Sequence, residues 1–340
     1  MQTKDIIILA IESSCDDTAT AILRNNVVLS NVVARQSIHK EYGGVVPELA
    51  SRAHQQNIVP VVDVALKKAE IMIQQLDAIA FTQGPGLMGS LLVGTSFAKS
   101  LALSLQIPLI AVNHMHAHIL AHFIEEKGFD KPTFPFLALT ISGGHTQIVK
   151  VNSFFNMEII GETTDDAVGE AFDKSAKILG LPYPGGPLID ELAQKGNPKK
   201  YTFTKPKVEG LNFSFSGLKT QILYFIQKNV KENSNFIEEN KADICASIQH
   251  TIIEILMDKL KLAVVQTGIN QIAIGGGVSA NSGIRTKLKE TETTLGWKTY
   301  IPKFEYTTDN AAMIGIVAYH YYLENKFNKT NVVSKARIEF

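Results

Sequence analysis

The chain has 340 residues, 45% of them hydrophobic, and its 33 lysines and arginines balance its 33 aspartates and glutamates. This length predicts two domains, and the balanced charge excludes a global electrostatic pull onto nucleic acid or a membrane. The two cysteines, Cys15 and Cys245, are too few for a disulfide framework and suit a reducing cytoplasm. The apolar run 6–11 is too short for a signal segment, so we expect neither secretion nor membrane insertion.

Two predicted hairpins with small polar turns, one in each half of the chain, carry the first functional signal. The strand 6–11 leads through ESSCDDT (12–18) into a strand over 19–23, and the strand 136–141 leads through SGGHT (142–146) into 147–151. Such turns expose backbone N–H groups, which suit a phosphate. One such turn is explained as well by an ordinary β-turn. The matched pair resembles the phosphate loops of the actin, sugar kinase and Hsp70 superfold, which implies an α/β fold of two lobes with duplicated sheets and a ligand cleft between the lobes.

The remaining patterns place the other elements along the chain. Between the hairpins we expect helices over 45–54 and 57–69, a strand over 78–82, a glycine-rich turn over 83–90 with a helix through Leu103, and a strand over 107–112. Beyond them we expect a helix over 165–179, a rigid loop over 182–187, long helices entered at 212–220 and over 242–262, a solvated connection over 228–241, a strand over 271–274 and a final helix from 307–313. We assign 1–130 with 306–330 to lobe one, 131–305 to lobe two, and 331–340 to a C-terminal tail.

Histidines cluster where the strand 107–112 gives way to a helix. His114 and His118 stand at i and i+4 and share one helical face, so they can bind one cation. His116 points elsewhere, and His122 lies about 12 Å along the axis from His114, so further ligands must come from a distant part of the chain. A zinc protease of the His-Glu-x-x-His type needs a glutamate where Met115 stands, so that interpretation lacks its base. A helix that merely carries polar histidines is the alternative.

Other residues allow two interpretations each. Asp309 is either a cap of the final helix or the oxygen ligand that a histidine pair lacks. Asp173 and Asp190 are either solvated or functional carboxylates. The glycines 275–277 suit close approach to a nucleotide, with Asn281 as donor and acceptor. The lysines of 199–207 alternate with aromatic residues, as in a nucleic-acid-binding patch or a charged surface loop.

Specific motifs over residues 5–320 are similar to those of the bacterial tRNA N(6)-adenosine threonylcarbamoyltransferases. They are ESSCD (12–16), YGGVVPELAS (42–51), GPG (84–86), HxxxH (114–118), SGGHT (142–146), GEAFDK (169–174), YPGGP (183–187), FSFSGLK (213–219), GGGVSAN (275–281) and TDN (308–310). Several relatives have glutamate where this chain has Asp17, so we do not assign catalysis to that residue. The fold alone leaves a kinase or a chaperone ATPase as the alternative.

The resemblance implies a site and a reaction. It implies one divalent metal, iron(II) by preference with zinc fitting the same ligands, held by His114, His118 and Asp309, and magnesium accompanying a bound nucleotide. It implies contacts to threonylcarbamoyl-AMP from Thr140, Ile141, Ser142, Gly143, Gly144, Asp173, Gly186, Asp190 and Asn281. The threonylcarbamoyl group then passes to the exocyclic amine of the adenosine beside the anticodon of tRNAs that read codons beginning with A, and AMP leaves. We assign the general base to Asp16, as a hypothesis, because it lies in the first phosphate turn.

The same resemblance implies partners. These are tRNA, a shorter paralogous subunit that forms a heterodimer through lobe-one helices, and a small P-loop ATPase. Our candidate surface for the paralogous subunit is 49–69, which has apolar residues on two faces. We expect a cytoplasmic protein without membrane contact.

Overall fold

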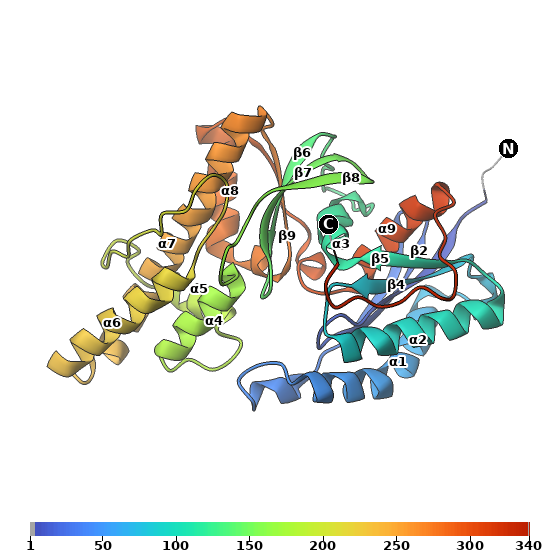
Figure 1. The fold of residues 1–340 in the computed structure, drawn as a ribbon, viewed down its shortest axis with the longest axis horizontal. Coiled ribbons are helices and arrows are strands. Elements are labelled where there is room, and N and C mark those ends of the chain that lie inside the picture. Colours follow the sequence, from blue (N-terminus) through green and yellow to red (C-terminus); the bar gives the residue numbers. More distant parts are fainter. Residues whose placement is uncertain (1–3, 339) are drawn as a thin grey trace. The chain divides into compact units, whose positions relative to one another are not determined.

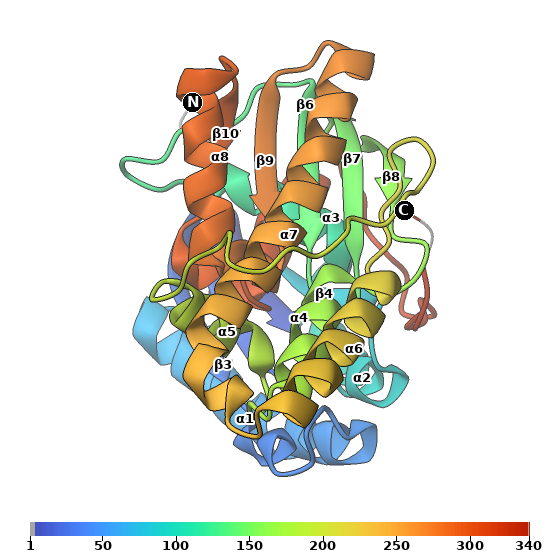
Figure 2. The same ribbon diagram turned by 90° about the vertical axis from the view of Figure 1, so that its left-hand side faces the viewer.

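The computed structural model describes residues 4–338 and 340 as two compact units, each built on one five-stranded sheet (Figures 1 and 2). Unit 1 comprises Met1–Lys131 with Pro302–Phe340, and unit 2 comprises Pro132–Ile301. The segment 333–336 packs within unit 1, where Lys335 donates a backbone hydrogen bond to Gln83 and Ser334 bonds the hydroxyl of Thr95.

The sheet of unit 1 has the order β3-β2-β1-β4-β5. Its strands are β1 (Ile7–Glu12), β2 (Thr18–Arg24), β3 (Val27–Ala34), β4 (Ala78–Gly84) and β5 (Leu109–Asn113). The helices are α1 (Pro47–Ala69), α2 (Met88–Leu105), α3 (His114–Leu120) and α9 (Ala311–Leu323). The first three strands are antiparallel, and β1, β4 and β5 are parallel. Figure 1 shows α1 and α2 on one side of this sheet and α9 on the other. Both faces are therefore covered, and the parallel strands β1 and β5 are buried along almost their whole length.

Unit 2 repeats this plan, with the sheet order β10-β9-β6-β7-β8. Its strands are β6 (Phe136–Ile141), β7 (Thr146–Ser153), β8 (Asn156–Glu162), β9 (Gln271–Gly275) and β10 (Lys298–Tyr300). The helices are α4 (Val168–Ile178), α5 (Gly185–Ala193), α6 (Ser216–Glu232), α7 (Phe236–Thr267) and α8 (Ser282–Thr294). Again three antiparallel strands are extended by two parallel ones. The expected duplication of a hairpin-led sheet is therefore confirmed, and Figure 2 shows α7 in front of the strands that share its core.

Short 3-10 helices complete the described chain at Ser37–Lys40, Ile73–Gln75, Ala121–Phe123, Gly277–Ala280 and Phe304–Tyr306. Within residues 4–338 and 340, α2 is the one helix long and apolar enough to cross a membrane. It packs against α1 and β4, as a core helix of a globular unit does.

Two local predictions are wrong. The expected solvated connection over 228–241 is helical except at 233–235, because Phe236 and Ile237 pack against the core of unit 2 and extend α7 toward α6. The expected loop over 182–187 already contains the first turn of α5. That helix begins early because Asp173 Oδ1 accepts hydrogen bonds from the backbone N–H groups of Gly185 (2.8 Å) and Gly186 (3.2 Å).

Candidate functional site

The histidine pair is placed by a strand that turns directly into a helix. Asn113 ends β5 and caps α3, since its side-chain oxygen accepts hydrogen bonds from the N–H groups of Met115 (2.8 Å) and His116 (3.4 Å). This cap puts His114 at the first helical position and His118 one turn later on the same face. Both imidazoles are buried.

Asp309 joins the two histidines. Its Oδ1 lies 3.5 Å from His114 Nε2 and 3.3 Å from His118 Nε2, and the two Nε2 atoms are 3.2 Å apart. Two donors that share one ion at about 2.1 Å, with angles near 90–109°, stand about 3.0–3.4 Å apart. The three side chains therefore fit one metal ion. In the part of the chain that the structure describes, they form the one histidine, cysteine and carboxylate group with this geometry.

The cap interpretation of Asp309 is wrong. The final helix α9 begins at Ala311, and its cap is Asn310, whose Oδ1 accepts from Met313 N at 3.0 Å. Asn310 also donates from Nδ2 to the carbonyl of Thr308 at 2.8 Å. The neighbouring aspartate is thus free of capping and directs its carboxylate to the histidines.

Sequence reasoning missed Glu12, which ends β1 and is wholly buried. Its Oε2 lies 2.9 Å from His114 Nδ1 and accepts from Thr82 Oγ1 at 2.6 Å, while Oε1 accepts from Ser14 N at 2.5 Å. The sequence offered two signals: a carboxylate that closes an otherwise apolar strand, and its place as the first residue of the ESSCD motif. Both were assigned to the polar turn and not to the histidine cluster.

Charge at the cluster favours a bound cation. Burial alone lowers the pKa of His114, but the carboxylates of Glu12 and Asp309 outweigh it and hold that pKa well above its usual range. Burial raises the pKa of Asp309, yet the attraction of His114 and His118 brings it far below the ordinary value. His116 differs: burial lowers its pKa to about 4, and its ring packs edge-on against Phe340, with centroids 4.8 Å apart. Its exclusion from the ligand set agrees with the helical spacing.

Asp16, the hypothetical general base, lies half-buried in the β1–β2 turn of the same unit. Burial, then the charges of Asp16 and Asp309, raise the pKa of Asp17 to about 7. Burial and the same two carboxylates also raise the pKa of the Cys15 thiol. The turn is therefore within electrostatic reach of Asp309, and the role of Asp16 stays a hypothesis.

In unit 2, the β6–β7 turn is open to a ligand. A Cβ added to Gly143 or Gly144 would meet no atom within 4 Å. Ser142 Oγ accepts from the N–H groups of Gly144 (3.3 Å) and His145 (3.0 Å), which shapes the turn. Behind it, a Cβ at Gly169 would come within 2.7 Å of the Ser142 carbonyl oxygen, so the first turn of α4 packs directly on this backbone.

The next two substrate contacts in the implied set, Thr140 and Ile141, are buried in β6. Thr140 Oγ1 donates to the carbonyl of Gln147 at 3.4 Å. The Ile141 carbonyl faces Gly276, where an added Cβ would come within 2.5 Å and where φ is +89°. Thr140 and Ile141 therefore help to hold the β6–β7 turn in place. The side chain of Ile141 is buried, so this residue offers only its backbone to a ligand.

The polar residues of the set each tie two helices of unit 2 together. Asp173 of α4 holds the start of α5 through the two glycine N–H groups given above. Asp190 of α5 accepts from Ser282 N (2.8 Å) and Ser282 Oγ (2.7 Å) at the start of α8. Asn281 accepts from Ile284 N at 3.0 Å and donates to Gln249 of α7 at 2.7 Å. A merely solvated role for the two carboxylates is therefore wrong.

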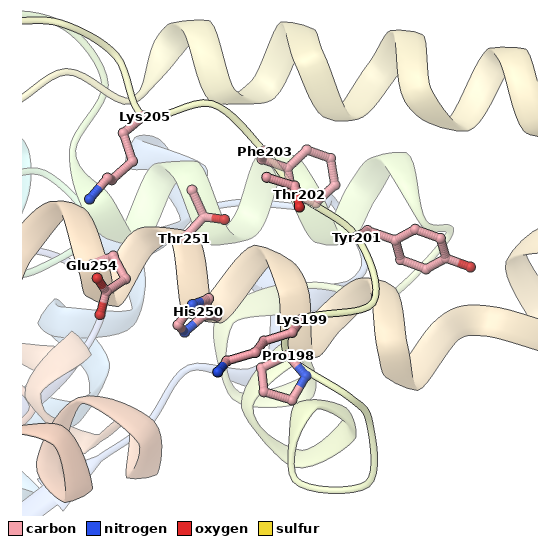
Figure 3. Close-up of a pocket in the computed structure, with 9 residues that line it drawn as sticks. All are labelled: Pro198, Lys199, Tyr201, Thr202, Phe203, Lys205, His250, Thr251 and Glu254. Carbon is pink, nitrogen blue, oxygen red and sulfur yellow. The ribbon is translucent and has the colours of Figure 1, made fainter.

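The lysine-rich segment 199–207 is better described as a charged surface loop than as a nucleic-acid patch. Lys200 pairs with Asp243 at 2.6 Å, and Lys205 pairs with Asp258. Phe203 is buried, and Tyr201 packs against Phe225, so the aromatic rings serve the core. A cavity of about 430 Å³ lies between this loop and α7. Figure 3 shows the residues that line it, among them His250, Thr251 and Glu254 of α7.

Comparison with known proteins settles the family. The TsaD model, described as tRNA N6-adenosine threonylcarbamoyltransferase, matches residues 27–316. The protein of that name from Christiangramia forsetii is 69% identical over 340 residues and covers 100% of both chains. Its namesake from Riemerella anatipestifer is 61% identical over 336 residues, covering 99% of this chain and 98% of its own.

Among solved structures, full-length HypF in its phosphate- and nucleotide-bound form has a TM-score of 0.64 at 14% identity, covering 95% of this chain and 47% of that one. This likeness concerns the fold alone, and it confirms the predicted actin-like class together with the duplicated sheets. The chain belongs to the family of tRNA N6-adenosine threonylcarbamoyltransferases.

Proposed function

We propose that this chain transfers the threonylcarbamoyl group of threonylcarbamoyl-AMP to the exocyclic amine of the adenosine beside the anticodon, in tRNAs that read codons beginning with A. AMP is the leaving group. The observation that carries the proposal is the 69% identity to a named transferase over the full length of both chains. The two-histidine, one-carboxylate cluster of unit 1 supports it independently.

The reaction needs both activation and positioning. The amine is a poor nucleophile because its lone pair is delocalised into the base. Its nitrogen attacks the carbamoyl carbon, the new C–N bond forms, and the bond from that carbon to the phosphate oxygen breaks with the electron pair leaving on AMP. The amine proton passes to a base, for which Asp16 is our hypothesis.

We assign His114, His118 and Asp309 as ligands of one divalent metal. Two histidines and a carboxylate with open positions suit iron(II), and zinc accepts the same donors. When bound, such an ion supplies Lewis acidity for the carbonyl or the departing phosphate. Glu12 contacts His114 at Nδ1, whereas Nε2 faces the other two ligands, so we assign Glu12 to the ligand cluster and not to proton transfer.

The turn of Ser142, Gly143 and Gly144 is our proposed phosphate site, since open space lies beside its two glycines. Ser142 N already donates to the His145 carbonyl and Gly144 N to Ser142 Oγ, so the Gly143 N–H is the donor that we assign to the phosphate. Asp173, Asp190 and Asn281 would act on the same adenylate while they hold the starts of α5 and α8. We include Gly186, where an added Cβ would only touch Phe172 at 3.7 Å, and the backbone of 140–141. A magnesium ion would accompany a bound nucleotide.

We also propose companion subunits: a shorter paralogue and a small P-loop ATPase. The formal net charge is zero and two lysines of the best basic loop are paired, so the chain alone should bind tRNA weakly. In unit 1, the adjoining helices α1 and α2 leave Val59, Leu92 and Leu103 exposed by 60%, 48% and 69%, which suits a paired subunit. We place the protein in the cytoplasm, where tRNA is modified.

The test is transfer to tRNA in vitro and in cells. Purified chain with companion subunits, threonylcarbamoyl-AMP and tRNA should yield threonylcarbamoyladenosine by nucleoside mass spectrometry, with one AMP per modified nucleoside. His118→Ala should abolish the product, whereas His116→Ala, on the same helix but facing away from the ligands, should retain it. An undiminished nucleoside level in cells depleted of this protein would refute the proposal.

A further inference from the structure

Glu12 is the buried charge that neither the ligand set nor the substrate contacts explain. Its side chain is 0% exposed at the end of β1, inside the sheet of unit 1. A buried carboxylate is costly unless several donors satisfy it. The presence of this carboxylate in the core of the sheet therefore needs an explanation.

Three donors converge on this carboxylate. Oε1 accepts from the backbone N–H of Ser14, and Oε2 accepts from the hydroxyl of Thr82 on the neighbouring strand β4. Oε2 also lies 2.9 Å from His114 Nδ1. An amide could meet the same three partners only by donating its NH2 hydrogens to the Thr82 hydroxyl and to His114 Nδ1, which would move the imidazole proton to Nε2. Of the two groups, only the carboxylate accepts from His114 Nδ1.

The contact to His114 fixes which ring nitrogen faces the ligand cluster. A carboxylate at Nδ1 keeps a proton on that atom, so Nε2 is the nitrogen that loses its proton and offers a lone pair when a cation binds beside Asp309 and His118. Glu12 thereby restrains the rotation of the ring about its side-chain bonds. The arrangement has the form of a carboxylate, histidine and metal relay, in which the outer carboxylate orients the ligand and increases its basicity.

We propose that Glu12, held by Thr82, is a positioning residue that aims His114 Nε2 at a divalent metal ion. The inference rests on the metal ligands of the proposed function, and it adds a residue that contacts one of those ligands and not the metal itself. In this proposal Glu12, at the end of β1, increases the affinity of the site for the metal. Thr82 on β4 contributes indirectly, because its hydroxyl holds Glu12 in place.

The test measures zinc affinity of the folded, metal-free protein by competition with a chromophoric chelator. Glu12→Gln should weaken zinc binding by about 10–100-fold, the usual loss for an outer carboxylate partner. Thr82→Val should weaken it by a smaller factor. Thr20→Val on β2 is the matched control, because the buried Thr20 hydroxyl has no hydrogen-bond partner among the described residues, and it should leave the affinity unchanged.

A purely structural role predicts a different pattern. Glu12→Gln would then lower the melting temperature of the metal-free protein while its folded fraction bound zinc as tightly as wild type, and that result overturns the inference. Should Glu12→Gln fail to fold, Thr82→Val against Thr20→Val decides the same question. If the wild-type protein itself binds no zinc, the metal centre of the proposed function is wrong, which is a distinct outcome.

Discussion

Two adjacent residues, Asp309 and Asn310, should separate metal binding from helix capping. Asp309 approaches the two histidine Nε2 atoms at 3.3 and 3.5 Å, whereas Asn310 caps α9 through Met313 N at 3.0 Å. We therefore expect Asp309→Asn to lose metal with little change in folding, and Asn310→Ala to lose stability while it retains metal.

The magnitudes follow from charge and capping. Asp309→Asn removes one full negative charge from the ligand set, and a charge pair about 4 Å apart in a partly buried site contributes about 4 kcal/mol. Metal affinity should then fall roughly a thousandfold, since about 1.4 kcal/mol corresponds to a factor of ten. Asn310→Ala removes a cap worth about 1 kcal/mol, which lowers the melting temperature of a unit of this size by about 2–4 °C.

The assay combines metal content by elemental analysis, zinc affinity by chelator competition and thermal unfolding of the metal-free proteins. Asn310→Asp is a useful control, because aspartate caps as well as asparagine. An Asp309→Asn protein that keeps its metal and its transfer activity would refute the ligand assignment. Metal loss in Asn310→Ala as large as in Asp309→Asn would show that the cap and the ligand cannot be separated.

Three further predictions concern the turns and loops around these sites. Gly169→Ala should weaken AMP binding measured by calorimetry, because its methyl group would meet the Ser142 carbonyl at 2.7 Å and displace the β6–β7 turn; unchanged affinity contradicts the close packing. Gly84→Ala should expose the 333–336 segment to limited proteolysis, since the added Cβ would overlap the Lys335 carbonyl, and wild-type protection would count against this. For Asp165, burial raises the pKa, but hydrogen bonds from the segment before α6 outweigh it, so the folded-state pKa lies below the ordinary 3.8. Its stabilisation is thus fully present above pH 3.8 and is lost as pH falls through the lower folded-state pKa. The advantage of wild type over Asp165→Asn in urea resistance should therefore shrink as pH falls below 3.8, and a pH-independent difference would exclude this account.

The local sequence pattern was sufficient to predict those helices and strands whose residues repeat with a clear helical or strand period. The apolar runs that became β1, β6 and β9 and the i, i+4 spacing of His114 and His118 needed only periodicity. The segment 228–241 was wrongly predicted to be a solvated connection, because most of its residues are polar. Phe236 and Ile237 nevertheless pack against the core of unit 2. A linear sequence shows how polar a segment is, but it does not show which of its residues meet the core.

The missing parts of the site were those assembled over long chain separations. Nothing in the spacing relates Glu12 to His114. The residues alone left Asp309 as either a helix cap or a metal ligand, and only the family resemblance chose between these two roles. Asp309 also lies in a TDN motif where either polar residue could serve as the cap, and only the hydrogen bond to Met313 identifies Asn310 as that residue. In the same way, Tyr201 and Phe203 alternate with lysines as base-stacking residues do, yet their packing against the core decides otherwise.

The polar residues of unit 2 have structural roles that are compatible with the binding roles proposed for them. Asp173 uses Oδ1 for both of its hydrogen bonds to the start of α5, and among the described residues its Oδ2 accepts none. A carboxylate offers about four lone-pair sites, so this second oxygen is available to a ligand while the first holds the helix. Two consecutive N–H groups point at one oxygen, which fixes the direction of the other. The residue that holds the start of α5 therefore also presents a preorganised acceptor, and a substitution such as Asp173→Ala would alter the helix start and the proposed binding atom together.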